Sequence, residues 1–238
     1  MMKRFFVIAL FVLGLGQLYA QPVRDTAWTK AGYFGLKLTQ VSLSSWSAGG
    51  ESALAFDSQI TYSADFKRDR QLWQNRLELG YGLTKNDGKS ARKTNDKIYF
   101  ASTYGYQIYK TLYWSALLNF NTQFAKGYDY NIEDSDFISK FMAPGYLMIG
   151  TGVTWSPNKI FTATFTPASW RGTIVADSRL SDEGAFGVDK GKHLLSEFGA
   201  NLKAEVNYEF LPNMKVYSRL ELYSNYLKDP QNIDIRWE

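Results

Sequence analysis

The single histidine of the chain lies in the one segment with the residues for catalytic chemistry. His193 is three residues before Ser196, and Asp182, Glu183 and Asp189 precede it. A histidine that takes a serine proton would create a nucleophile of the kind that lipid-modifying enzymes use. All five residues, however, share one Gly-rich segment without the sharp strand-to-helix turn that holds such a serine. We therefore expect a solvated loop histidine, no catalytic residue and no enzyme.

The acidic residues of another segment offer ligands for a metal ion. Asp129, Glu133, Asp134 and Asp136 carry the oxygen atoms that calcium prefers, but their spacing is not that of an EF-hand loop. We interpret the segment as a solvated acidic loop, with a position near the divalent ions that bridge anionic surface lipids as the alternative. The chain has no cysteine, which excludes disulfides and thiolate metal sites. We expect no metal site and no cofactor.

Two segments with several small residues are possible ligand sites. Residues 46–50 combine a tight turn with a tryptophan, and we interpret them as a structural turn, with a ligand-binding lip as the alternative. Gly184, Gly187 and Gly191 are not followed by the strand-to-helix junction of a phosphate-binding loop. Neither segment predicts a specific ligand.

Charges of opposite sign recur on the two sides of a three-residue connection at 211–213. If this connection is the turn of a hairpin, acidic and basic residues lie opposite one another on one face. A slip of one residue would turn these charges to the other face, which fixes the register. We interpret the pairs as structural links inside the molecule. The predicted charge pairs are Glu205 with Arg219, Lys203 with Glu221, and Glu209 with Lys215. The same register predicts Phe210 opposite Met214, Tyr208 opposite Val216, and Leu202 opposite Leu222.

The elements that position these residues are β-strands. Between 197 and 210, apolar and polar residues alternate one by one, which indicates a strand with two different faces. Similar runs recur along the chain, and they have the length of roughly 9 to 11 residues that membrane-crossing strands need. They predict an all-β fold, an antiparallel up-and-down transmembrane β-barrel with about 10 strands in this chain and about 12 in a complete version. The runs cover about 33–43, 52–66, 72–84, 97–108, 112–124, 145–155, 160–175, 197–210 and 214–226, and another begins at Ile233.

Connections between the runs alternate between short turns and long polar loops. Outer-membrane barrels have tight periplasmic turns and long outer loops, so we expect the long loops on the cell surface. The short turns lie at 67–71, 109–111, 156–159 and 211–213, and the long loops at 44–51, 85–96, 125–140, 177–196 and 227–232.

Aromatic residues of the apolar faces collect near the strand ends, as in the girdles of membrane barrels. Because a Lys or Arg held toward lipid costs roughly 2–4 kcal/mol, we expect the apolar face to meet lipid and the charges to lie inside. Near the short turns the predicted girdle comprises Phe66, Trp73, Tyr106, Trp114, Trp155, Phe161, Tyr208 and Phe210. Near the long loops lie Tyr81, Phe124, Phe198 and Tyr226.

The first twenty residues have the layout of a secretory signal peptide. Lys3 and Arg4 precede an apolar run that ends at Ala20 with a small residue. We expect cleavage before Gln21, with 1–20 as the signal peptide and 21–238 as the barrel, although an N-terminal anchor helix is the alternative. The chain would then use the general secretory route and the barrel-assembly machinery, and would contact outer-membrane lipid. The net charge of +4 is dispersed, and no nucleic-acid partner is expected.

Several stretches resemble the domain of unknown function 3078 family of predicted outer-membrane barrels in Gram-negative bacteria. They are QVSLSSWSAGGE (40–51), LGYGL (79–83), SALLNFNTQFAKGY (115–128), DEGAFGVDKG (182–191) and SNYLKDPQNIDIRWE (224–238). The resemblance implies an outer-membrane location and brings no activity, ligand or catalytic residue. In the family's pattern the strands continue beyond NIDIRWE, so we expect a barrel that is incomplete at its C-terminus, with closure by a short tenth strand as the alternative.

Three classes of function follow. The one we favour is a structural or binding envelope protein whose lumen is filled by paired charges. A narrow channel for small solutes is the second, and an outer-membrane lipid-modifying enzyme is the third.

Overall fold

The structure, a computed structural model, describes residues 27–43, 50–132, 136–158, 160–212 and 214–237. Its main element is a ten-stranded sheet in which each strand pairs antiparallel with its neighbour along the chain, in the order β1-β2-β3-β4-β5-β8-β9-β10-β11-β12. The all-β, antiparallel up-and-down fold and the ten strands predicted from the sequence are confirmed. The strands are β1 (Trp28–Val41), β2 (Ala53–Arg68), β3 (Gln71–Asn86), β4 (Arg92–Tyr109), β5 (Leu112–Thr122), β8 (Gly145–Trp155), β9 (Phe161–Ile174), β10 (Leu194–Leu211), β11 (Met214–Asn225) and β12 (Ile233–Trp237).

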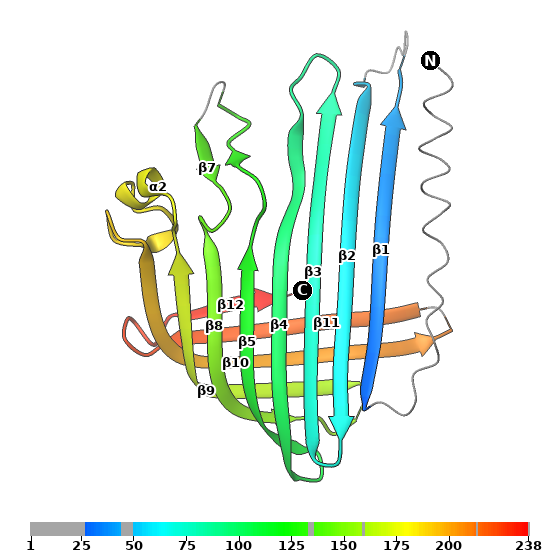
Figure 1. Cartoon of the computed structure of the whole chain (residues 1–238), viewed down its shortest axis with the longest axis vertical. Helices are drawn as coiled ribbons and strands as arrows, with labels where there is room; N and C mark the ends of the chain where they lie inside the picture. Colours follow the sequence, from blue (N-terminus) through cyan, green and yellow to red (C-terminus); the bar gives the residue numbers. More distant parts are fainter. Residues whose placement is uncertain (1–26, 44–49, 133–135, 159, 213, 238) are drawn as a thin grey trace.

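Two of the long connections contain structure that the sequence did not predict. The loop after β5 holds a second small sheet of β6 (Gly127–Tyr128) and β7 (Phe137–Ser139). The loop after β9 holds the helix α2 (Ser178–Asp182) and a 3₁₀ turn at Ala185–Gly187. These segments lie together at one end of the molecule, at the top of Figure 1. A small apolar core stabilises them: Ala143, Val175, Leu180 and Val188. No helix among the described residues is long and apolar enough to cross a membrane.

The burial of the two sheet faces is the reverse of that in a soluble sheet protein. On one face, polar side chains such as Thr164 and Asn201 are at most 5% exposed. On the other face, Phe34 is 65% exposed and Phe165 is 50% exposed. The alternation predicted from the sequence therefore has its polar side turned toward the interior and its apolar side turned outward.

The predicted register of the β10–β11 hairpin is confirmed over most of its length. Leu202 pairs with Leu222 and Tyr208 with Val216, as expected. Phe210 opposite Met214 is wrong, because a bulge beyond Glu209 places Leu211 opposite Met214 instead. A bulge adds one residue to one strand and breaks the alternation at that point.

A second bulge, in the middle of β9, reverses the faces of that strand. Thr166 and Pro167 together lie opposite Gly152 of β8, and the ladder with β10 shifts at the same place. Before the bulge the even-numbered Thr164 is buried, whereas after it the odd-numbered Ser169 is buried. Proline cannot donate to a ladder and is confined to edges and bulges within sheets.

The sheet is strongly bent. In Figure 1, β1–β4 run along the long axis, while β10 curves and continues across it with β11 and β12. Tyr99 of β4 and Arg219 of β11 line one cavity, although four strands lie between them in the sheet order, so the sheet encloses a concave face. Among the described residues no ladder joins β1 to β12, which are the outer strands. The sheet is thus open there, and a closed barrel stays a prediction.

Gly152 is needed at the β9 bulge because a side chain there would meet backbone. A Cβ at this position would lie 2.0 Å from the carbonyl oxygen of Phe165. We predict that Gly152→Ala lowers the unfolding free energy by about 1–3 kcal/mol, as overpacking does. The measurement is urea unfolding of protein refolded into detergent micelles. Gly105→Ala is the matched control, since its nearest neighbour would be 3.6 Å away. Equal loss in both variants would contradict the role of Gly152.

Candidate functional site

The concave face of the sheet holds a cavity of about 520 Å³. Side chains from eight elements reach it: the strands β4, β5, β8, β9, β10, β11 and β12, and the 3₁₀ turn. Its wall is mostly polar and includes three tyrosines. The polar lining residues are Tyr99, Asn119, Asn121, Tyr146, Arg171, Thr173, Glu197, Asn201, Arg219, Glu221, Tyr223, Asp234 and Arg236. This cavity is the candidate functional site.

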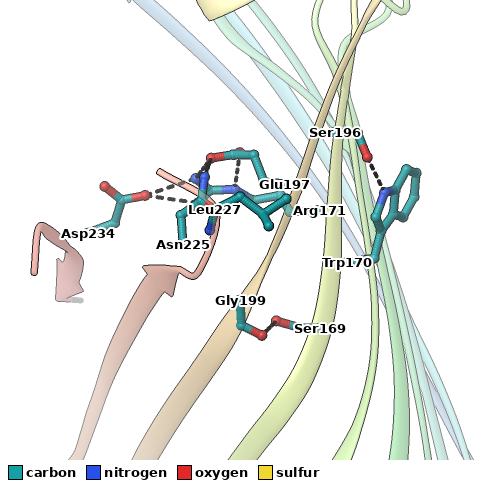
Figure 2. A network of polar contacts seen from close by, with 9 residues as sticks. All are labelled: Ser169, Trp170, Arg171, Ser196, Glu197, Gly199, Asn225, Leu227 and Asp234. Atoms are coloured by element: carbon teal, nitrogen blue, oxygen red, sulfur yellow. Dashed lines mark hydrogen bonds and ion pairs between the residues drawn. The ribbon is translucent and has the colours of Figure 1, made fainter. Parts of the chain in front are cut away.

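Arg171 is the centre of the polar network on this wall (Figure 2). Its Nε and Nη2 donate to the two carboxylate oxygens of Glu197, at 2.7 and 3.0 Å. Its Nη1 and Nη2 both donate to Oδ2 of Asp234 at 3.0 Å. Every guanidinium nitrogen therefore has an acceptor, and β9, β10 and β12 are linked through one side chain. Such two-pronged contacts between Arg and carboxylate are the strong, orienting kind.

The ring of Tyr223 packs against the guanidinium of Arg171. The guanidinium carbon lies 4.0 Å from the centre of the tyrosine ring, a close cation–π contact. The ring packs where Gly199 has no side chain, since a Cβ on Gly199 would lie 3.0 Å from Tyr223 Cζ. Tyr223 is 4% exposed, and its hydroxyl has no hydrogen-bond partner in the described part of the chain. A buried hydroxyl without a partner costs about 1–3 kcal/mol, which calls for an explanation at this site.

The hairpin charges predicted from the sequence lie on the same inner face, with partly different partners. Glu205 Oε1 is 3.5 Å from Arg219 Nε, and Glu209 Oε2 is 3.4 Å from Lys215 Nζ. Lys203 is opposite Glu221 in the ladder, but its Nζ contacts Glu205 Oε2 at 3.2 Å. Other contacts complete the hairpin: Tyr217 donates to Glu205, and Asn201 donates to Glu221.

A further charge cluster extends this face to β3 and β4. Glu78 is 9% exposed, and its carboxylate forms ion pairs with Arg76 Nε, at 2.5 Å, and with Lys97 Nζ, at 2.6 Å. The inner face thus carries ion pairs from β3 to β12. Each buried carboxylate here has a cationic partner, which is the condition for tolerating charge away from water.

The predicted girdle residues lie on neighbouring strands near the short turns. Rings from adjacent strands touch, such as Trp155 and Phe161 with centroids 5.6 Å apart. Phe66 pairs with Trp73 in the ladder, and Tyr106 pairs with Trp114. Phe66 and Phe161 are half-buried, and the others are exposed: Trp73, Tyr106, Trp114, Trp155, Tyr208 and Phe210.

His193 and Ser196, the candidate catalytic pair, each contact another residue. His193 Nδ1 lies 2.7 Å from the carbonyl oxygen of Val175, while Ser196 Oγ accepts from Trp170 Nε1 at 2.6 Å. In Figure 2, Ser196 lies on the opposite side of the sheet from Arg171. Glu133, Asp134 and residues 46–49 lie outside the described residues, as does the predicted signal peptide. Within the described part of the chain, no three His, Cys, Asp or Glu gather as metal ligands.

Ion pairs also hold the loops at the end of the sheet that carries α2. Lys140 Nζ lies 2.5 Å from Asp177 Oδ2, and Asp177 Oδ1 accepts from Leu180 N as the cap of α2. The contact with Lys140 is the main cause that lowers the pKa of Asp177. Likewise the hydrogen bond from Lys89 is the main cause that lowers the pKa of Glu51. The ion pairs that hold these loops therefore involve none of the residues that line the cavity.

The sequence did not predict the Arg171 network. Unbroken alternation along 160–175 would place Arg171 on the apolar face, because Phe161 and Phe165 share its parity. The bulge at Pro167 moves it inward. A proline within a predicted strand was the available signal, since it demotes a strand or marks a bulge.

These features define an all-β protein with one large antiparallel sheet, a polar concave face and an apolar convex face. Residues 38–128, from the second half of β1 to β6, match the family model described as Protein of unknown function (DUF3078). This match supports the family resemblance predicted from the sequence over these residues, and the family's description carries no activity. No curated protein and no solved structure matches the chain.

Removal of Arg171 should leave Glu197 without its cation. Side-chain exposure at this pair is 28% for Arg171 and 12% for Glu197. We predict that Arg171→Met lowers the unfolding free energy by about 3 kcal/mol, the lower end for a broken buried pair. The double variant Arg171→Met/Glu197→Leu should recover part of this loss. Lys192→Met, at a pair with Asp189 that is about 70% exposed, is the control and should change stability by about 0.5 kcal/mol or less. Urea titration measures all three, and equal effects at both sites would contradict the network.

Proposed function

We propose that this chain is an outer-membrane β-barrel protein whose interior is filled by paired polar side chains, with a structural or binding role in the envelope. The observation that carries the proposal is the reversed burial of the two sheet faces. Leu36 and Ile60 are 62% and 42% exposed on the outer face, while Glu78 and Ser115 are buried on the inner face. In water such a surface would be an aggregation hazard, whereas lipid would cover it.

The lengths and ends of the strands support the same proposal. The first nine strands of the sheet have 11 to 18 residues, and a tilted strand needs about 9 to 11 to cross a bilayer. Exposed aromatic rings near the short turns suit the interfacial level of a membrane. Export would use the signal peptide predicted at 1–20, and insertion would use the barrel-assembly machinery.

The ion pairs of the inner face favour a plugged interior over an open pore. Arg171, Glu197 and Asp234 bridge three strands across the concave face, and Glu205 lies among Lys203, Arg219 and Tyr217. Paired, hydrogen-bonded charges leave little continuous water and need no mobile counterions. A narrow channel for small solutes is the second candidate, and the 520 Å³ cavity is the observation that favours it.

The location is tested on the full-length protein in cells. We predict recovery in the outer-membrane fraction, cleavage before Gln21, and different gel mobility before and after boiling. Tags inserted at Lys89 or Gly187, in loops between strands, should react with an impermeant reagent on intact cells. A tag in the turn at Asp69 is the control and should react only after permeabilisation. Recovery as a soluble periplasmic protein would overturn the proposal.

Conductance separates the plugged barrel from the channel. In planar bilayers we expect low conductance from the unmodified protein, because its inner charges are paired. Glu205→Lys adds a third cation to Lys203 and Arg219 and should destabilise the barrel or open a leak. Adding Arg219→Glu restores an opposite charge and should reverse part of the effect. Large, steady conductance from the unmodified protein would favour the channel instead.

A further inference from the structure

We propose that the cavity on the concave face binds an uncharged carbohydrate of about monosaccharide to disaccharide size. The inference deepens the proposed function, because it assigns a class of ligand to the interior of the same barrel. It depends on three properties of the wall: its charge balance, its tyrosines and the unpartnered hydroxyl of Tyr223.

Charge balance on the wall argues against a charged ligand. The lining contains three cations, Arg171, Arg219 and Arg236, and three carboxylates, Glu197, Glu221 and Asp234. Arg171 is bonded through every guanidinium nitrogen, and Arg236 lies opposite Glu221 in the ladder. A net charge on a ligand would have to displace one of these partners, which leaves the other partner uncompensated.

Neutral hydroxyl groups can use the same wall without breaking an ion pair. Each carboxylate has about four acceptor positions on its two oxygens. Glu221, for example, accepts a hydrogen bond from Asn201 at 2.9 Å through one of its oxygens. The side-chain amides of Asn119 and Asn121 add a donor and an acceptor each. A compound with many hydroxyls, each able to donate and accept, matches this arrangement.

The aromatic side chains supply the remaining part of a sugar site. Tyr99, Tyr146 and Tyr223 line the cavity together with Phe186 of the 3₁₀ turn. Ring faces pack against apolar C–H surface, and a phenol adds a polar tip to such a face. The hydroxyl of Tyr223 is buried and has no hydrogen-bond partner among the described residues. A ligand that displaces the neighbouring side chains from this hydroxyl would supply the missing partner.

The cavity also has the right dimensions. Its volume of about 520 Å³ lies within the range of about 300–1,000 Å³ that is typical of small-molecule sites. Phe186 and Leu195 line it, so the cavity extends to the 3₁₀ turn and the start of β10.

The test uses the full-length protein, refolded in lauryldimethylamine oxide, because a maltoside detergent would itself present a sugar. Saturation-transfer NMR is recorded with maltose and trehalose, and with glucuronate and glucosamine as charged probes. We expect saturation of the two neutral disaccharides and little of the charged probes. Tyr223→Phe keeps the ring under Arg171 and should weaken disaccharide binding about three- to tenfold, the effect of one lost hydrogen bond. Tyr208→Phe is the control, since this tyrosine is 46% exposed on the outer face of β10 and lies outside the cavity lining, and it should leave binding unchanged.

Three outcomes would overturn the inference: no binding of any probe, preference for the charged probes, or equal binding by wild type and Tyr223→Phe. The boil-dependent gel shift verifies that each variant is folded before titration. A protein that inserts and conducts weakly but binds no sugar overturns the carbohydrate site alone. Recovery of a soluble, sugar-binding protein overturns the barrel alone.

Discussion

Charge pairing on the concave face is the constraint on which the structure depends. The sheet turns its polar side inward, so carboxylates such as Glu78 and Glu197 are removed from bulk water. A carboxylate is tolerated there only with a cation and further hydrogen bonds around it. The cations come from neighbouring strands, Lys97 for Glu78 and Arg171 for Glu197. Strand order and register therefore decide whether the inner face is stable.

Curvature and charge pairing are linked through the β9 bulge. Without the extra residue at Pro167, Arg171 would point to the apolar face and Glu197 would lose its partner. A bulge also bends its strand and increases the local twist, and β10, which pairs with β9 across the bulge, is visibly curved in Figure 1. The bulge thus turns the Arg171 guanidinium inward. The bulge also belongs to the bend that brings Asp234 of β12 within hydrogen-bond distance of this guanidinium.

The sequence predicts regular features well and irregular ones poorly. Period-two alternation located all ten strands, because each face repeats over many residues. The β10–β11 register followed from a short turn and from the cost of misplacing charges. Phe210 was misplaced and the inward position of Arg171 was missed, because a uniform alternation does not include bulges. The α2 segment was missed because a helix of five residues, Ser178–Asp182, has too few turns to show a period. Lys203 contacts Glu205 instead of its ladder partner Glu221. This contact depends on side-chain geometry, which the register does not determine.

The order of the strands has a consequence for how the chain folds. Every ladder of the large sheet joins strands that follow one another, apart from the β6–β7 insertion, so each hairpin can form from local contacts. Low sequence separation of contacts favours fast folding. The bond between Arg171 and Asp234, 63 residues apart, is different, since it requires β12 to be in place. Formation of that bond is thus a late event, and it marks the moment when the growing sheet has curled far enough for β12 to reach β9.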